Sequence, residues 1–202
     1  MSKKIAPWKT YLQKALHKNR SLRGAARSNL FSRYFALATV TKDGFPANRM
    51  VVFRGFLEDS NKLEIITDVR SQKIEDLTHN CYGEICWYFA KTREQFRIRG
   101  KIEIITGNHD NQELLKEHQK IWQKLSLAGK EQFYWGNPRE LFIDNSEIKS
   151  IDIDEENPRE NFSLLLLNPD MVDHLELKGN PQNRHIYEID NEEKWHIKKV
   201  NP

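Results

Sequence analysis

A series of short apolar segments separated by turn residues constrains the fold of this chain more than any other feature of its sequence. Two of these segments lie within residues 32–56 and flank Asp43-Gly44, a dipeptide typical of tight β-hairpins because glycine readily adopts positive φ. Further strand-like segments follow at 61–68, 82–90 and 95–106. Because strands and helices do not alternate, we expect a mainly β, antiparallel fold: a split or closed β-barrel with a few peripheral helices.

The segment 95–106 carries a glycine in its middle. Apolar Phe96, Ile98 and Ile102 alternate with charged residues, and the alternation changes phase near Gly100. A glycine in this position is typical of a β-bulge or a barrel corner. We therefore predict a bulge at Gly100.

The remaining segments predict peripheral helices, a loop and the end of the sheet. The length of 202 residues fits a single domain, 1–202. Helices are expected within 1–30, at 71–80 and at 111–130, an irregular loop or lid at 136–161, and two closing strands at 162–177 and 184–200.

The charge of the chain gives little support for a nucleic-acid or membrane partner. Its 32 Lys and Arg residues nearly balance 29 Asp and Glu residues, for a formal net charge of +3. The basic residues are concentrated locally, since residues 1–33 contain no Asp or Glu. This segment predicts either a basic arm for nucleic acid, with affinity that falls with salt, or a helix that caps the barrel. The helical spacing of Trp8, Leu12, Ala15 and Leu16 favours the capping helix.

Cysteines and histidines show no metal-binding or disulfide pattern. Cys81 and Cys86 are five residues apart, which places them on opposite faces of a strand, and we expect both to be small buried residues in a reducing compartment. The seven histidines are scattered, so no metal site is predicted, and His118 is expected to be an ordinary core or boundary residue. No apolar run has the length of a membrane helix and the N-terminus lacks a secretory signal, which predicts a cytoplasmic protein.

Polar donors gather at the ends of two predicted strands. In "RMVVFR", Arg49 and Arg54 bracket an apolar strand, so one can reach the ring and the other the tail of a ligand. In "ITDVRSQK", hydroxyl, amide and cationic side chains lie where a strand becomes a helix, an arrangement that favours an anion site. Each patch alone is also compatible with a solvated charged turn.

Together, four segments resemble the pyridoxamine 5'-phosphate oxidase-like family of FMN-binding split barrels. They are "NRMVVFRGF", "LEIITDVRSQKIEDL", "CWYFAKTREQFRIRGKIE" and the closing "LELKGNPQNRHIY", in the order and approximate spacing of the family. The resemblance is specific over residues 32–107 and looser over the last thirty residues. It implies a homodimer with FMN bound at the subunit interface.

The resemblance also implies roles for single residues. Arg49 is expected at the phosphate or ribityl chain, and Arg54, where the family often has lysine, at the ring, where a cation would stabilise the negative charge gained on reduction. Gln72 replaces an arginine, a loss of charge for which Arg70 or Arg49 is expected to compensate. The other FMN contacts implied are the backbone of Met50, Val51 and Val52, the ribityl contacts Ile66 and Thr67, the phosphate turn Ser71, Gln72 and Lys73, Gln95 from the partner subunit, Ser126, and Arg184 at the pyrimidine end.

The sequence departs from the true pyridoxamine phosphate oxidases in the closing segment. Leu177 stands where those enzymes have tryptophan, and their R-x-H-D-R substrate motif is missing. The pattern is closer to an uncharacterised FMN-binding branch marked by "W..LS......F.W..P", formed here by Trp122, Leu125, Ser126, Phe133, Trp135 and Pro138. We therefore expect an FMN-dependent oxidoreductase with an unknown small-molecule substrate. The alternative is a flavin-binding or sensing module without turnover.

Overall fold

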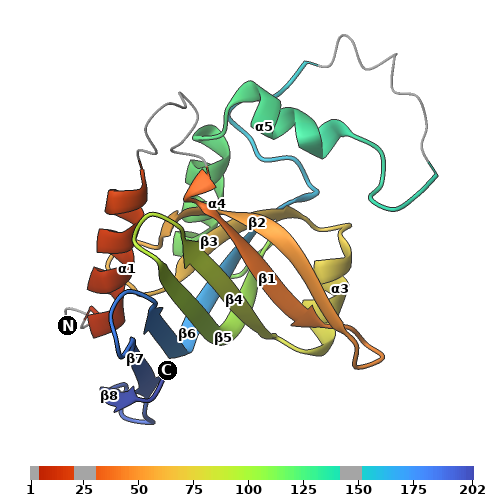
Figure 1. The fold of residues 1–202 in the computed structure, drawn as a ribbon. Helices are drawn as coiled ribbons and strands as arrows, with labels where there is room; N and C mark the ends of the chain where they lie inside the picture. The colour runs from red at the N-terminus through yellow and green to blue at the C-terminus, as the bar shows by residue number, and fades with distance from the viewer. Residues whose placement is uncertain (1–4, 21–30, 142–151) are drawn as a thin grey trace.

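Antiparallel strands form most of the structure, a computed structural model that describes residues 5–20, 31–141 and 152–202 (Figure 1). The elements, in chain order, are α1 (Pro7–Asn19), β1 (Tyr34–Val40), β2 (Pro46–Phe56), β3 (Leu63–Asp68), α3 (Gln72–His79), β4 (Tyr82–Phe89), β5 (Glu94–Ile105), α4 (Gln112–Gln123), α5 (Leu127–Glu131), the 3-10 helix η1 (Gln132–Tyr134), β6 (Phe162–Glu176), β7 (Asn183–Ile189) and β8 (Trp195–Val200).

Six of the strands close into a barrel. The strand order is β3-β2-β1-β4-β5-β6-β7-β8, and an additional pairing of β3 with β6 completes the ring, so that β7 and β8 extend beyond it. Alternate residues of each strand point inward, and Phe35, Leu37, Ile85, Trp87 and Ile98 are buried in the core. The predicted mainly β, antiparallel barrel with a few peripheral helices is confirmed.

Two glycines shape the barrel as predicted. Gly44 adopts a φ of 84° in the turn between β1 and β2. At Gly100 the register of β5 against β6 shifts, and a Cβ atom there would lie 2.0 Å from the carbonyl oxygen of Asn168. The bulge therefore brings two backbones into contact at a distance that only glycine permits.

Helix α1 packs on the barrel with its apolar face. Trp8, Leu12 and Ala15 are fully buried, and the ring of Trp8 lies 5.9 Å from that of Trp195 near the C-terminus (Figure 1). Lys14 and Lys18 are exposed on the other side. The described part of the basic segment is thus the expected covering helix, whereas residues 1–4 and 21–30 lie outside the described residues.

The prediction of a single helix over 111–130 is wrong, because two helices occupy this segment. α4 ends at Gln123, and Ser126 begins α5 as its N-cap, with its Oγ accepting a hydrogen bond from the backbone N–H of Gly129 at 3.2 Å. Trp122 on α4 packs with Phe162 in a second apolar cluster outside the barrel.

The closing segment and the cysteines also differ from the prediction. Residues 184–200 form two strands, because Asp190 accepts hydrogen bonds from two backbone N–H groups in the turn between them. Cys81 and Cys86 are exposed rather than buried, and neither forms a disulfide. The described stretches of the predicted loop, 136–141 and 152–161, contain no helix or strand, and 142–151 lie outside the described residues. No helix in the described part of the chain combines the length and apolar character needed to cross a membrane.

Candidate functional site

A groove of about 470 Å³ runs along the part of β2 that lacks a strand partner on one side. β2 pairs with β1 along Pro46–Val52, but its register with β3 covers only Phe53, Gly55 and Phe56. The barrel is therefore split beside the first part of β2, and residues from both faces of that strand reach the groove. The lining residues are Arg49, Met50, Val51, Val52 and Arg54 from β2, Ile66, Thr67, Asp68, Arg70, Ser71 and Lys73 from the end of β3 and the following turn, and Gln132, Phe133, Trp135, Gly136 and Pro138 from the opposite wall.

At one end of the groove, a lysine and two hydroxyl groups converge, and we call this end the phosphate end. Lys73 Nζ donates to Thr67 Oγ1 at 2.8 Å and to Ser71 Oγ at 3.0 Å, and the two hydroxyl oxygens are 3.0 Å apart. Burial, reinforced by the nearby Arg49, lowers the pKa of Lys73 to about 8. Because ammonium, guanidinium and hydroxyl donors meet here, the donor set fits a phosphate monoester.

Arg49 is held at this end by a residue that the sequence analysis missed. Asp76 of α3 is fully buried, and its Oδ2 accepts from Thr39 Oγ1 at 2.6 Å and from Arg49 Nη2 at 3.2 Å. Burial would raise the pKa of Asp76, but the hydrogen bonds from Thr39, Gln72 and Arg49 outweigh it and lower the pKa. The spacing of Asp76 four residues after Gln72 on a helix was the only sequence signal for its place.

The other end of the groove combines apolar side chains with an arginine. Met50 and Val52 line it together with Arg54, whose Nε is buried and has no hydrogen-bond partner among the described residues. Burial, and secondarily the positive charge of Arg33, lower the pKa of Arg54. A buried N–H without a partner is costly, so this end of the groove is suited to a ligand that accepts a hydrogen bond.

Arg70 connects the two walls instead of facing a ligand. Its guanidinium binds both carboxylate oxygens of Asp68, at 2.9 Å and 2.6 Å, and also donates to Asn137 Oδ1 at 2.9 Å and to the carbonyl oxygen of Trp135 at 3.2 Å. Arg49 is held in a similar way by Asp76 and Thr39. Lys73, whose bonds go to hydroxyl oxygens, is therefore the cation of the phosphate end without an ion-pair partner among the described residues.

Four residues implied by the resemblance lie outside the groove. Gln72 points away from it, and Ser126 caps α5. Gln95 on β5 and Arg184 on β7 lie on one cross-strand row, since each pairs with Leu175. Arg184 forms a two-point ion pair with Asp173, at 3.0 Å and 2.8 Å, which raises its pKa.

One group of metal-ligand type side chains occurs elsewhere on the barrel. Potential ligand atoms of Glu94, His174 and Glu176 lie within 4.8 Å of one another. Glu94 Oε2 is 3.0 Å from Nε2 of the buried His174, and this pair joins β5 to β6. No sequence pattern indicates this group, because Glu94 lies 80 residues before His174 and meets it through strand pairing.

Comparisons with known proteins match the first half of the chain to a family and the whole chain to one curated relative. The family described as pyridoxamine 5'-phosphate oxidase, FMN-binding domain, matches residues 5–106. A pyridoxine/pyridoxamine 5'-phosphate oxidase 2 of Arabidopsis thaliana is 38% identical over 205 aligned positions, which cover 100% of both chains. A pyridoxine/pyridoxamine 5'-phosphate oxidase of Rhizobium leguminosarum bv. trifolii is 39% identical over 71 residues, 35% of this chain and 34% of that one.

Solved structures show the same similarity. A pyridoxamine 5'-phosphate oxidase-related, FMN binding protein of Nostoc punctiforme superimposes with a TM-score of 0.91 at 44% identity, over 98% of this chain and 100% of that one. PhzG of Burkholderia lata, in complex with tetrahydrophenazine-1-carboxylic acid, gives a TM-score of 0.75 at 19% identity over 96% of this chain and 92% of that one, a likeness that shows the fold alone.

Proposed function

Because the chain belongs to the pyridoxamine 5'-phosphate oxidase FMN-binding family, we propose that it binds FMN in the groove and uses it in an oxidation–reduction reaction. FMN, when bound, supplies the hydride and electron chemistry, and the protein supplies binding, orientation and charge. We propose a small molecule as the substrate.

The donor set at the phosphate end supports this function most directly. Lys73, Thr67 and Ser71 offer an ammonium and two hydroxyl groups within 3.0 Å of one another, and Asp76 holds Arg49 beside them. We propose that these residues hold the FMN phosphate, that Ile66 lies by the ribityl chain, and that the ring lies along Met50–Arg54. The unpartnered Nε of Arg54 would then donate to the ring end.

We further propose that the protein is a homodimer whose partner completes each site. Directly paired residues of antiparallel strands share a face, so Met50, Tyr88, Gln95 and Arg184 lie on the outer face of one continuous sheet. Met50 and Tyr88 are exposed there although both are large apolar residues. A second copy that covers this face would bring its Gln95 and Arg184 toward the groove, as the family resemblance implies.

A flavin-binding or sensing module without turnover is the second candidate function. It is favoured by the closing hairpin, in which Leu177 stands where the true oxidases have tryptophan and their R-x-H-D-R substrate motif is missing. Reduction of the bound flavin by NAD(P)H or by pyridoxamine phosphate, followed by reoxidation in air, favours the oxidoreductase. Failure of every reductant in such a screen favours the module.

The cofactor itself is tested by an absorbance spectrum of the purified protein and by mass spectrometry of the released ligand. We expect flavin bands and the mass of FMN, or the appearance of both after FMN is added to ligand-free protein. Protein that is colourless, and stays so after FMN is added, would contradict the proposed function.

A further inference from the structure

A second hollow of about 570 Å³ lies beside the phosphate end of the groove. The linings of the groove and the second hollow share Arg70, Ser71 and Pro138. Gln72 lines the second hollow but not the groove. Gln72, the side chain expected at the phosphate, therefore points away from the groove, to the other side of the turn.

Every polar atom of the Gln72 side chain has a protein partner. Its Oε1 accepts a hydrogen bond from Arg139 Nη1. Its Nε2 donates to Asp76 Oδ1 at 3.2 Å and to Glu75 Oε2 at 3.1 Å. The amide thus bridges Arg139 to Asp76, the carboxylate that holds Arg49 at 3.2 Å.

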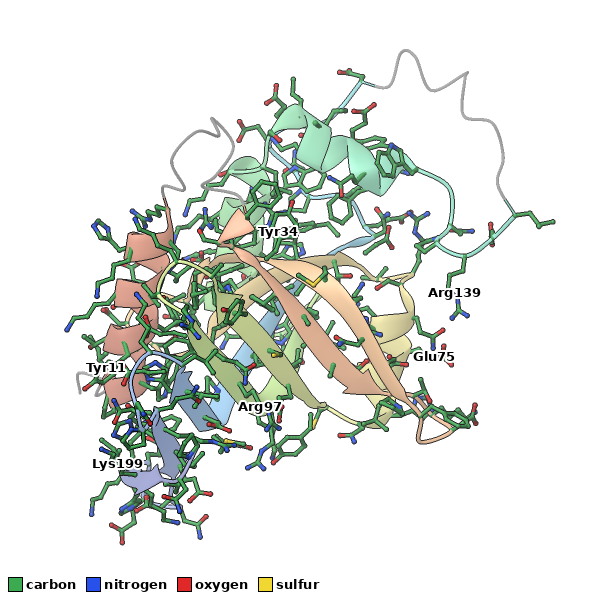
Figure 2. The ribbon with its side chains drawn as sticks, in the orientation of Figure 1. Tyr11, Tyr34, Glu75, Arg97, Arg139 and Lys199 are labelled. Carbon is green, nitrogen blue, oxygen red and sulfur yellow. The ribbon has the colours of Figure 1, made fainter. Side chains whose placement is uncertain are left out.

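Arg139 belongs to the segment that forms the opposite wall of the groove. Trp135, Gly136 and Pro138 of this segment line the groove, and Arg139 follows directly with a φ of 72°, which is uncommon for a residue other than glycine. Figure 2 shows Arg139 pointing from this wall toward the side of α3 that carries Glu75. The Arg139–Gln72 contact therefore joins the two walls just beyond the phosphate end.

We propose, on the basis of the FMN function proposed above, that Gln72 and Arg139 form a clamp that makes the site select FMN over flavin dinucleotides. A phosphate monoester ends at Lys73 and Ser71 and fits inside the clamp. A dinucleotide continues past this point toward the second hollow, which shares Ser71 and Pro138 with the groove and across which the clamp lies. Gln72 and Arg139 are positioning residues, since their bonds go to protein atoms.

The clamp is tested by measuring dissociation constants for FMN and for FAD by flavin fluorescence, with Arg139→Ala, Gln72→Ala and the double variant. Each single variant is expected to reduce the preference for FMN by on the order of tenfold, the lower end of the contribution of a hydrogen bond to a charged group. Because the two residues act through one contact, the double variant is expected to lose no more than either single variant. Arg139→Lys keeps a donor for Gln72 Oε1 and is expected to restore the preference.

Two matched variants show what the loss of an arginine or a glutamine side chain does away from the clamp. Arg93 is exposed, has a φ of 57° and lines neither the groove nor the second hollow, so Arg93→Ala reproduces the chemistry of Arg139→Ala away from the clamp. Gln13, exposed on α1, serves Gln72→Ala in the same way. Both controls are expected to keep the wild-type ratio of FMN to FAD affinity.

Three outcomes would overturn the clamp. The first is a ratio of FMN to FAD affinity that is unchanged in the Arg139 and Gln72 variants. The second is a loss of preference in the double variant that equals the product of the two single losses. The third is an equal loss of preference in Arg93→Ala. If the wild-type protein binds FMN and the variants give one of these results, the clamp is contradicted but the proposed FMN function is not. Wild-type protein that binds neither flavin contradicts the proposed function, and the clamp with it.

Discussion

Lys73 is the side chain on which binding at the phosphate end depends most directly. Its pKa, lowered to about 8 by burial and by Arg49, means that the ligand-free protein loses this positive charge as the pH rises through that value. We predict that FMN affinity falls above about pH 8, and that Lys73→Met lowers it on the order of a hundredfold, since a bond to a charged group contributes about 1.5–3 kcal/mol. Titration of FMN into the wild-type protein and into Lys73→Met, followed by flavin fluorescence below and above that pH, measures both changes in affinity.

Riboflavin and a second lysine provide the controls for Lys73. Riboflavin lacks the phosphate, so Lys73→Met is expected to change its affinity little. Lys62 pairs with Glu103 at 3.0 Å and does not line the groove, so Lys62→Met is expected to leave FMN binding intact. Equal losses for FMN and riboflavin would mean that Lys73 does not act through the phosphate.

Glu64 is a buried carboxyl group whose ionisation lowers the free energy of unfolding, by an amount that depends on pH. It is 3% exposed, its Oε1 has no hydrogen-bond partner among the described residues, and burial, then Glu117, raises its pKa from 4.5 to about 7. Between these values the unfolded chain releases a proton that the folded protein keeps, so the free energy of unfolding falls as the pH rises. Above about pH 7 the full cost of about 3 kcal/mol is present.

Replacement of Glu64 tests this cost. Glu64→Gln is expected to raise the free energy of unfolding at about pH 8 by up to about 3 kcal/mol, and to change it little at about pH 3, where the carboxyl group is largely protonated in both states. Urea unfolding at the two pH values measures the difference. Glu113→Gln, at an exposed position of α4, is the control, and a gain that is equal at both pH values would contradict the assigned pKa.

The bulge of β5 depends on the absence of a side chain at Gly100. A Cβ atom there would lie 2.0 Å from the carbonyl oxygen and 2.7 Å from the carbonyl carbon of Asn168, so the backbone of β5 or β6 would have to move. We predict that Gly100→Ala lowers the free energy of unfolding by about 2–4 kcal/mol in urea. Gly107→Ala, with no atom within 4 Å of the added Cβ, is the matched control, and equal effects of the two would contradict this account.

The strands and turns could be predicted from sequence because their signals are local. Asp43-Gly44 and Gly100 mark the places where the backbone turns or bulges. Alternation shows that Cys86 and Trp87 face opposite ways, but not which face is the core, and so the exposure of Cys86 was missed. The break before α5 was missed because the apolar spacing continues across Ser126, whose capping bond to Gly129 begins a second helix.

The same distinction applies to the groove. The contiguous runs 49–54 and 66–73 could be predicted as one wall because each carries its own sequence pattern. Phe133, Trp135 and Pro138 of the opposite wall belong to a sequence pattern, but their place in the groove could not be predicted. Neither could that of the buried Asp76, because folding alone brings these residues to the groove. Arg139 was missed for the same reason, since its partner Gln72 lies 67 residues away in the chain.

For the molecule as a whole, the exposed outer face of the sheet predicts a dimer. Light scattering is expected to give about twice the chain mass of 23.9 kDa. Tyr88→Arg, on the outer face, is expected to favour the monomer and weaken FMN binding, because Gln95 and Arg184 of the partner would be lost from the site. Ile197→Arg changes an exposed apolar residue of β8 and is expected to leave the dimer intact. A wild-type protein with the mass of one chain would contradict this prediction.

The open edge of β2 along Pro46–Val52 has a consequence for the protein before any ligand arrives. In the described structure its backbone has a strand partner on one side only, and such an edge can pair with a strand of another chain. FMN lying along this edge would block that pairing, so ligand-free protein is expected to become turbid on standing while FMN-saturated protein stays clear. A cell short of riboflavin would then lose this protein to aggregation of folded chains, well before any loss of the fold itself.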